Sequence, residues 1–166
     1  RPHLVLGVDF VGPFPRTNKG NTYIVTVVDY FSRFLWAIPI PDTLTSTLID
    51  ALLRHVFLIY GFPASLLSDR GSQFTSELYA ELLRVLGIRV RLTSAYKPST
   101  NGRTERVHRW LTPTMGLYAA DNKDWDDIVP YLVFGYNTQV HDVTGTLPAA
   151  LLHSVTPRVP LSELAD

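Results

Sequence analysis

The 166-residue chain contains no cysteine, which excludes a disulfide framework and any zinc site built on thiolates. Its five histidines are scattered, and no two of them stand at the spacing of a metal-binding pair. The chain also has no secretory leader and no apolar run long enough to cross a bilayer. We therefore expect a soluble, intracellular domain that does not contact a membrane.

A net charge is also absent, because 15 basic and 15 acidic residues cancel, so the overall charge does not indicate a nucleic-acid partner. Internal repeats and low-complexity segments are missing as well. Hydrophobic residues, in contrast, make up 46% of the chain, which suits one globular domain with a substantial core. Residues 1–166 are thus expected to form a single domain.

Hydrophobic periodicity predicts the order of the secondary structure. Three β-rich runs come first, and the segment GPFPRTNKGN joins the first two as a loop or hairpin. Two short strands follow later, separated by helical segments. Strands one to three form a meander and the last two arrive through helices, so the predicted fold is α/β, a mixed five-stranded sheet flanked by helices. The predicted strands are 4–10, 23–30, 34–40, 65–68 and 88–92, and the predicted helices are 45–60, 75–86, 101–119, 125–137 and 148–152.

Three acidic residues are hard to explain by folding alone. Asp9 and Asp69 each end an apolar run, and Glu105 follows a glycine at the start of a helical stretch. A charge on a mostly buried strand is costly unless a group of opposite sign satisfies it. If the fourth strand lies beside the first, Asp9 and Asp69 meet, and bound divalent cations would satisfy all three acids.

Positive charge surrounds the third of these acids. Between Arg84 and Arg109 the chain has seven basic residues, and Glu105 is the sole acid; the segment 121–127 reverses this balance. A basic stretch is often only a solvated surface. Its overlap with Glu105 favours a surface that faces phosphates.

The chain resembles the catalytic core of retroviral and gypsy-type LTR-retrotransposon integrases. The resemblance covers almost the whole chain and follows the family's order through VDFVGPFP, GNTYIVTVVDYFSRF, YGFPASLLSDRGSQFTS, LGIRVRLTSAYKPSTNGRTER and YNTQVHDVTGTLP. Thirty-five residues separate Asp69 from Glu105, which is the spacing that defines the family's triad of two aspartates and one glutamate. The resemblance implies a ribonuclease H-like fold.

By the same resemblance, Asp9, Asp69 and Glu105 are the catalytic residues and hold two Mg²⁺ or Mn²⁺ ions in the active site. Asp9 would bridge both ions, Asp69 would bind one and Glu105 the other. Carboxylates are the hard ligands that Mg²⁺ prefers, and two ions about 3.5–4 Å apart suit the in-line displacement of a phosphodiester. The implied reactions are processing of the element's DNA 3′ ends by water and their joining to target DNA.

Four further residues are candidates for DNA contact: Lys97, Asn101, Arg106 and Arg109. For these residues a structural role in capping or ion pairing is an equally good interpretation. Lys97 and Ser99 stand where related elements often carry His and Gln, a difference that concerns DNA-end contact and leaves the triad intact.

Other conspicuous residues have structural interpretations. We expect Gly71 to permit a tight backbone after Asp69, and Asp29 to end a strand with turn hydrogen bonds. His108 is expected to be a hydrogen-bonded or surface histidine. The same is expected of His141, and Trp36, Trp110 and Trp125 are expected to belong to the core.

The family's full enzymes also carry an N-terminal zinc-binding domain and a C-terminal DNA-binding domain. Neither is present in this sequence, so we expect an isolated catalytic core. The implied partners are double-stranded DNA, a second core in a homodimer, and a higher oligomer in the full-length protein. The implied locations are the host nucleus and the virion or virus-like particle.

Two other functions stay open. A domesticated integrase could keep the fold as a binding module without catalytic activity. A ribonuclease H-type nuclease would share the fold and the metals but cleave RNA in a hybrid, although the glutamate on a late helix and its flanking motifs disfavour that assignment.

Overall fold

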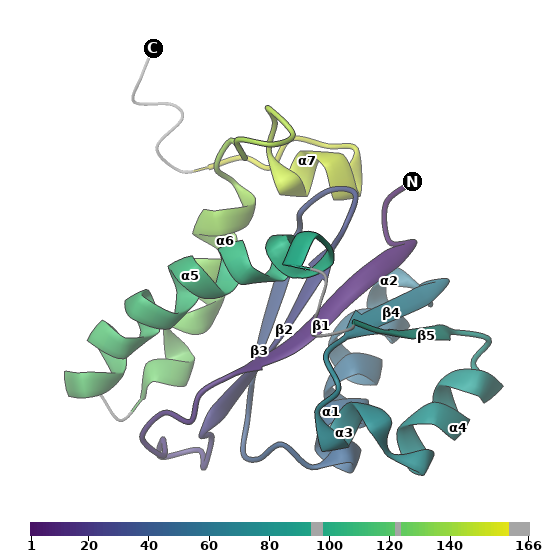
Figure 1. Ribbon diagram of the computed structural model, residues 1–166. Helices are drawn as coiled ribbons and strands as arrows, with labels where there is room; N and C mark the ends of the chain where they lie inside the picture. Colours follow the sequence, from purple (N-terminus) through teal and green to yellow (C-terminus); the bar gives the residue numbers. More distant parts are fainter. Residues whose placement is uncertain (94–97, 122–123, 160–166) are drawn as a thin grey trace.

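The computed structural model describes residues 1–93, 98–121 and 124–159, and of residues 98–105 and 121 it describes the backbone alone. Five strands form one sheet in the order β3-β2-β1-β4-β5, with β1 at its centre (Figure 1). The predicted mixed five-stranded sheet is therefore confirmed. The strands are β1 (Val5–Val11), β2 (Tyr23–Asp29), β3 (Leu35–Ile40), β4 (Ser65–Ser68) and β5 (Arg89–Leu92).

The two halves of the sheet differ in strand direction. β1, β2 and β3 pair antiparallel, as expected of consecutive strands joined by loops without a crossover helix. β4 and β5 pair parallel to their neighbours, because each is reached through a helical crossover. Pro39 is tolerated within β3 because this strand lies at the sheet edge.

Helices cover both faces of the sheet. α1, α3 and α4 lie on one face, and α5 and α6 lie on the other (Figure 1). The helical segments are α1 (Thr45–Leu52), the π-helical η1 (Leu53–Phe57), α2 (Leu58–Tyr60), α3 (Ser72–Thr75), α4 (Glu77–Val85), α5 (Pro98–Asp121), the 3₁₀ turn η2 (Trp125–Asp127), α6 (Val129–Asn137) and α7 (Pro148–His153). Within the described part of the chain, no helix is both long and apolar enough to span a membrane.

Side chains of β1 alternate between two hydrophobic cores. Leu6 and Val8 join the large core beneath α1 and α4, whereas Val11 joins the core beneath α5 and α6. Because successive side chains of a strand point to opposite faces, Asp9 belongs to the face covered by α5. The strand pattern thus decides which helix can reach this carboxylate.

The predicted helix 45–60 is not regular. Residues Leu53–Phe57 form a π-helical stretch, whose wider turn delays the helix by about one residue. As a result Ile59, which follows Leu48, Leu52 and Val56 at helical spacing, is 65% exposed, and Tyr60 packs against the core in its place.

The long helix also departs from the prediction. It begins at Pro98 rather than Asn101, and proline suits the first turn of a helix because its missing N–H has no partner there. Its buried face includes Met115 and Ala119, whereas Tyr118 is 45% exposed. The face that packs on the sheet consists of every fourth residue: Val107, Leu111, Met115 and Ala119.

Candidate functional site

Asp9 lies in the middle of the sheet, near the carboxyl end of β1. Its side chain is 32% exposed, and its Oδ1 accepts a hydrogen bond from the Phe10 N–H at 2.8 Å. Its Oδ2 lies 3.6 Å from Nδ1 of His108, which α5 supplies. Both carboxylate oxygens are therefore held by defined neighbours while part of the group remains open to solvent.

Asp69 directly follows β4, the strand beside β1. Val5 pairs with Ser65 and Gly7 with Leu67, so the continuation of this parallel register sets Asp69 opposite Asp9. The side-chain alternation that puts Asp9 on the α5 face applies equally to Asp69. The structure thus brings these two acids together, as the sequence interpretation required.

Gly71 shapes the turn after Asp69. The Asp69 Oδ1 accepts a hydrogen bond from the Gly71 N–H at 2.8 Å. The backbone of Gly71 has φ −55°, which other residues also adopt, so the tight turn does not depend on the conformational freedom of glycine. A Cβ at this position would instead lie 3.1 Å from the Asp69 carboxylate and 3.0 Å from the Gln73 amide oxygen. Glycine leaves room for the carboxylate.

The carboxylates of Asp9 and Asp69 interact electrostatically. Burial raises the pKa of the Asp9 carboxyl above its ordinary value of 3.8, and the negative charge of Asp69 adds to that rise. His108 and the Phe10 N–H act in the opposite direction. Among the side chains that the structure describes, no lysine or arginine lies within ion-pair distance of either acid. A pair of adjacent, mutually repelling carboxylates fits a bound cation.

Glu105 lies in the first half of α5, but its side chain is outside the described residues. Its backbone position is three residues before His108, whose imidazole contacts Asp9, and residues three apart share one side of a helix. Without this glutamate, no group of three or more potential metal-binding side chains occurs in the described ranges. The carboxylates of Asp9 and Asp69 are hard oxygen ligands that suit Mg²⁺ or Mn²⁺.

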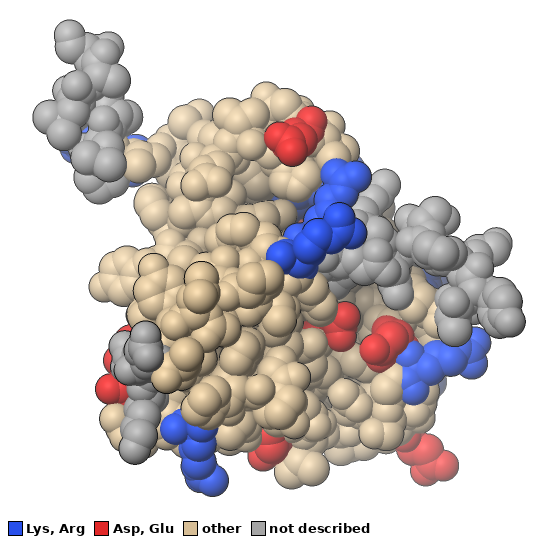
Figure 2. Space-filling model, turned by 60° about the vertical axis from the view of Figure 1, so that its left-hand side comes forward, with Lys and Arg blue, Asp and Glu red and all other residues tan. Residues whose placement is uncertain are grey.

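The predicted DNA-contacting residues are only partly visible. Lys97 and the side chain of Asn101 lie outside the described residues, while Arg106 and Arg109 are exposed on α5. Figure 2 shows acidic and basic side chains close together on one face of the molecule.

Arg33 is a buried basic residue close to Arg106 in space, an association that the sequence interpretation missed. It lies in the turn between β2 and β3, yet Arg33 and Arg106 both act on His141: burial and these two cations lower the pKa of the His141 imidazole. Seventy-two residues separate the two arginines, so no local pattern could have associated them.

The structural interpretations of the other residues are largely confirmed. Asp29 is completely buried and accepts hydrogen bonds from the Ser32 N–H and hydroxyl in the turn after β2. Trp36 and Trp125 are core residues, and Trp110 packs against two of the cores from a partly buried position. His108 is hydrogen-bonded, as expected, but its position beside Asp9 was not anticipated.

Comparison of the sequence with known proteins identifies a family and several relatives. The family model described as "Integrase core domain" matches residues 1–98. The chain is 30% identical over 154 residues to the "Retrovirus-related Pol polyprotein from transposon 412" of Drosophila melanogaster, an alignment that covers 92% of this chain and 12% of that protein. It is 25% identical over 160 residues to the human "Gypsy retrotransposon integrase-like protein 1", covering 96% of this chain and 30% of that protein.

Solved structures show the same fold. An intasome chain of simian T-cell lymphotropic virus, in complex with the PP2A regulatory subunit B56 gamma, matches with a TM-score of 0.77 at 23% identity, over 96% of this chain and 58% of that chain. The HTLV-2 integrase catalytic core domain in complex with magnesium matches with a TM-score of 0.72 at 18% identity, over 92% and 97% of the two chains. The predicted ribonuclease H-like fold is thereby confirmed. The chain spans less than a third of the length of either of the two relatives named above.

Proposed function

Because this chain belongs to the integrase core domain family, we propose that it catalyses the polynucleotidyl transfer of DNA integration, processing the 3′ ends of element DNA and joining them to target DNA. The observation that supports this proposal most directly is the parallel pairing of β1 and β4, which brings Asp9 and Asp69 together. Two carboxylates on neighbouring strands form an anionic site suited to divalent metal ions rather than a structural ion pair.

We assign the three acids distinct roles. Asp9 would bind both metal ions, since it lies on the central strand, Asp69 would bind one from the neighbouring strand, and Glu105 would bind the other from α5. When bound, the two ions would activate the attacking oxygen and stabilise the leaving oxygen of the phosphodiester. The HTLV-2 core, whose structure contains magnesium, is a neighbour in fold.

The DNA backbone would lie along the basic side of α5, where Arg106 and Arg109 are exposed. We propose that these arginines, together with Lys97 and Asn101, hold phosphates near the scissile bond. Such contacts position DNA without reading its sequence. An enzyme with this activity would act in the host nucleus and be carried in a virion or virus-like particle.

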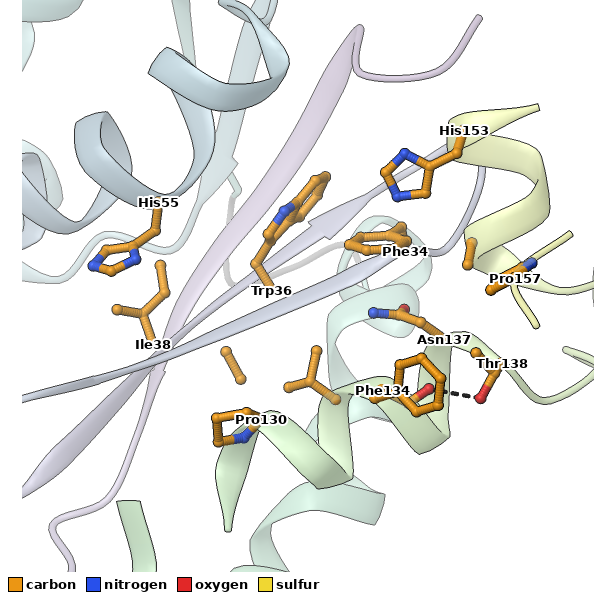
Figure 3. Close-up of a pocket in the computed structure, with 13 residues that line it drawn as sticks. Phe34, Trp36, Ile38, His55, Pro130, Phe134, Asn137, Thr138, His153 and Pro157 are labelled. Atoms are coloured by element: carbon orange, nitrogen blue, oxygen red, sulfur yellow. Dashed lines mark hydrogen bonds between the residues drawn. The ribbon is translucent and has the colours of Figure 1, made fainter. Parts of the chain in front are cut away.

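A homodimer of cores is proposed to form over the face shown in Figure 3. An apolar cavity of about 420 Å³ lies there between β3 and α6, lined by Trp36, Ile38, Val133 and Phe134 among others. Tyr131 on the same helix is 79% exposed. The HTLV-2 integrase catalytic core domain, a neighbour in fold, has been solved in a dimeric form. Light scattering should report a dimer that Phe134→Asp converts to a monomer, and an unchanged mass would contradict this interface.

Matched substrates test the proposed function against its alternatives. The protein should nick or join duplex DNA when Mg²⁺ or Mn²⁺ is present, and EDTA should stop the reaction. Preferential cleavage of an RNA–DNA hybrid would instead indicate a ribonuclease H, and DNA binding without any cleavage would indicate a binding module.

A further inference from the structure

His108 connects Asp9 with a buried hydroxyl group on the neighbouring strand. Its Nε2 lies 2.9 Å from Oγ1 of Thr26, and its Nδ1 lies 3.6 Å from Oδ2 of Asp9. Thr26 is completely buried and pairs with Asp9 across the β1–β2 ladder. Three residues from β1, β2 and α5 therefore meet at one point beneath the candidate metal site.

The single proton of the Thr26 hydroxyl has two acceptors in reach, Nε2 of His108 at 2.9 Å and the Asp9 carbonyl oxygen at 3.3 Å, and the shorter contact favours donation to Nε2. A neutral imidazole has one donor and one acceptor nitrogen. If the Thr26 hydroxyl donates to Nε2, the proton resides on Nδ1 and points toward the negative Asp9 carboxylate. The opposite tautomer would direct the Nδ1 lone pair at that carboxylate, which is repulsive. The chain Thr26 O–H to Nε2, with Nδ1–H facing Asp9, satisfies both nitrogens.

We propose that His108 is a positioning residue for Asp9, which sets the orientation of the carboxylate for metal binding through its Nδ1–H while Thr26 fixes the imidazole. This inference rests on the proposed function, since it takes Asp9 to be a metal ligand. The separation of 3.6 Å is longer than a hydrogen bond, so the contact in this state is electrostatic. Together with the 2.8 Å bond from the Phe10 N–H, it restrains both carboxylate oxygens.

The contacts of His108 with Asp9 and Thr26 also link α5 to the sheet beside the candidate site. His108 is 23% exposed and lies one turn after Glu105, so its attachment to Thr26 also sets the position of the helix that carries the third acid. Partners that orient metal-binding groups typically contribute about 10- to 100-fold to metal affinity. His108 should therefore affect metal binding more than it affects folding.

Mn²⁺ binding to the DNA-free protein, measured by calorimetry and by water proton relaxation, tests this role. We expect His108→Ala to weaken Mn²⁺ binding about 10- to 100-fold and Thr26→Val to weaken it in the same direction. His108→Asn, which keeps an N–H donor, should restore part of the affinity. His55→Ala, which replaces an exposed histidine on η1, is the matched control and should bind Mn²⁺ as the wild type does.

Nitrogen-15 NMR of the wild-type imidazole provides a measurement that does not depend on the variants folding. A pyrrole-type Nδ1 resonance for His108 supports the proposal, and a neutral ring protonated on Nε2 overturns it. Equal Mn²⁺ affinity of wild type and a folded His108→Ala variant also overturns it, while leaving the proposed function in place. A wild-type protein that binds no Mn²⁺ contradicts the proposed function itself, and the inference with it.

Discussion

Two acidic regions of this molecule have opposite surroundings. Around η2, the acids contact polar and basic groups of the β1–β2 loop: Asp126 accepts hydrogen bonds from Thr17 and Asn21, and Asp127 pairs with Lys19. At the end of β1 and β4, Asp9 and Asp69 lie beside each other, and His108 is the sole ion-pair partner that the described side chains provide.

This difference separates acids that contact polar or basic groups of a loop from acids that lie beside a like charge. Asp126 is 5% exposed, and its Oδ2 accepts hydrogen bonds from Thr17 and Asn21, which fix the loop 12–22 against the second core. Its Oδ1 is buried without a hydrogen-bond partner among the described residues. Asp9 and Asp69 each accept a backbone hydrogen bond, but no lysine or arginine among the described side chains offsets their charges, and adjacent carboxylates destabilise each other unless a cation is bound. Acid clusters of similar composition can thus be distinguished by their neighbours.

The largest expected effect is on catalysis. Asp9→Asn, Asp69→Asn or Glu105→Gln should each reduce Mg²⁺- or Mn²⁺-dependent strand transfer to below about one hundredth of wild type, since even the loss of a group that only supports a metal ligand costs about 10- to 100-fold. The measurement is the rate at which the full-length protein joins labelled DNA ends to target DNA. Asp124→Asn, in the other acidic region, is the control and should retain activity. Near-wild-type activity of any one triad variant would remove that residue from the site.

A second effect concerns DNA binding. Replacing Lys97 and Arg109 together with alanine should weaken binding to many DNA sequences alike and flatten the plot of log affinity against log salt by roughly 1–2 units. Fluorescence anisotropy over a range of salt concentrations measures the slope. Arg54→Ala, which removes an exposed arginine paired with Asp50, should leave the slope unchanged. If the double variant keeps the wild-type slope, Arg109 instead pairs with Glu105 along the helix, an interaction of about 0.2–0.5 kcal/mol.

A third effect concerns stability around η2. Asp126→Ala leaves Thr17 and Asn21 without their acceptor and should lower the free energy of unfolding by about 1–3 kcal/mol at neutral pH.

This loss of stability should depend on pH. Burial acts to raise the pKa of Asp126, but the hydrogen bonds from Asn21 and Thr17 and the charge of Lys19 lower it below the ordinary value of 3.8. The charged group therefore stabilises the fold above pH 3.8, and this contribution is lost as the pH falls through the lower folded-state pKa. Urea unfolding of both proteins should show a difference that is largest near neutral pH and shrinks in strong acid. A difference that grows in acid would contradict this account.

The smallest expected effect belongs to the exposed ion pair of the same region. Lys19 and Asp127 have side chains that are 61% and 57% exposed, and water screens such pairs strongly. Lys19→Ala should leave the thermal midpoint close to that of wild type, and the small difference should vanish in high salt. A loss as large as that of Asp126→Ala would mean that the exposed pair, rather than the buried acid, holds the loop.

Most of the fold could be predicted because its signals are local. The β-rich runs of β1 and β2 and the periodicity of the helical segments placed the main elements within a few residues of their observed ends. The π-helical stretch Leu53–Phe57 could not be predicted in this way, because it adjusts the helix to the packing beneath it and has no distinct residue pattern. The exposure of Ile59 is the consequence.

The sequence by itself determined the order of the strands and helices, the family resemblance and the candidate triad, because spacing and apolar periodicity are properties of neighbouring residues. The tertiary structure decided which distant residues meet. The parallel register of β1 and β4 brings Asp9 to Asp69, and the packing of α5 on β1 brings His108 to both Asp9 and Thr26. These contacts depend on how the crossovers and helices pack in three dimensions, and no local pattern in a single chain encodes such distances.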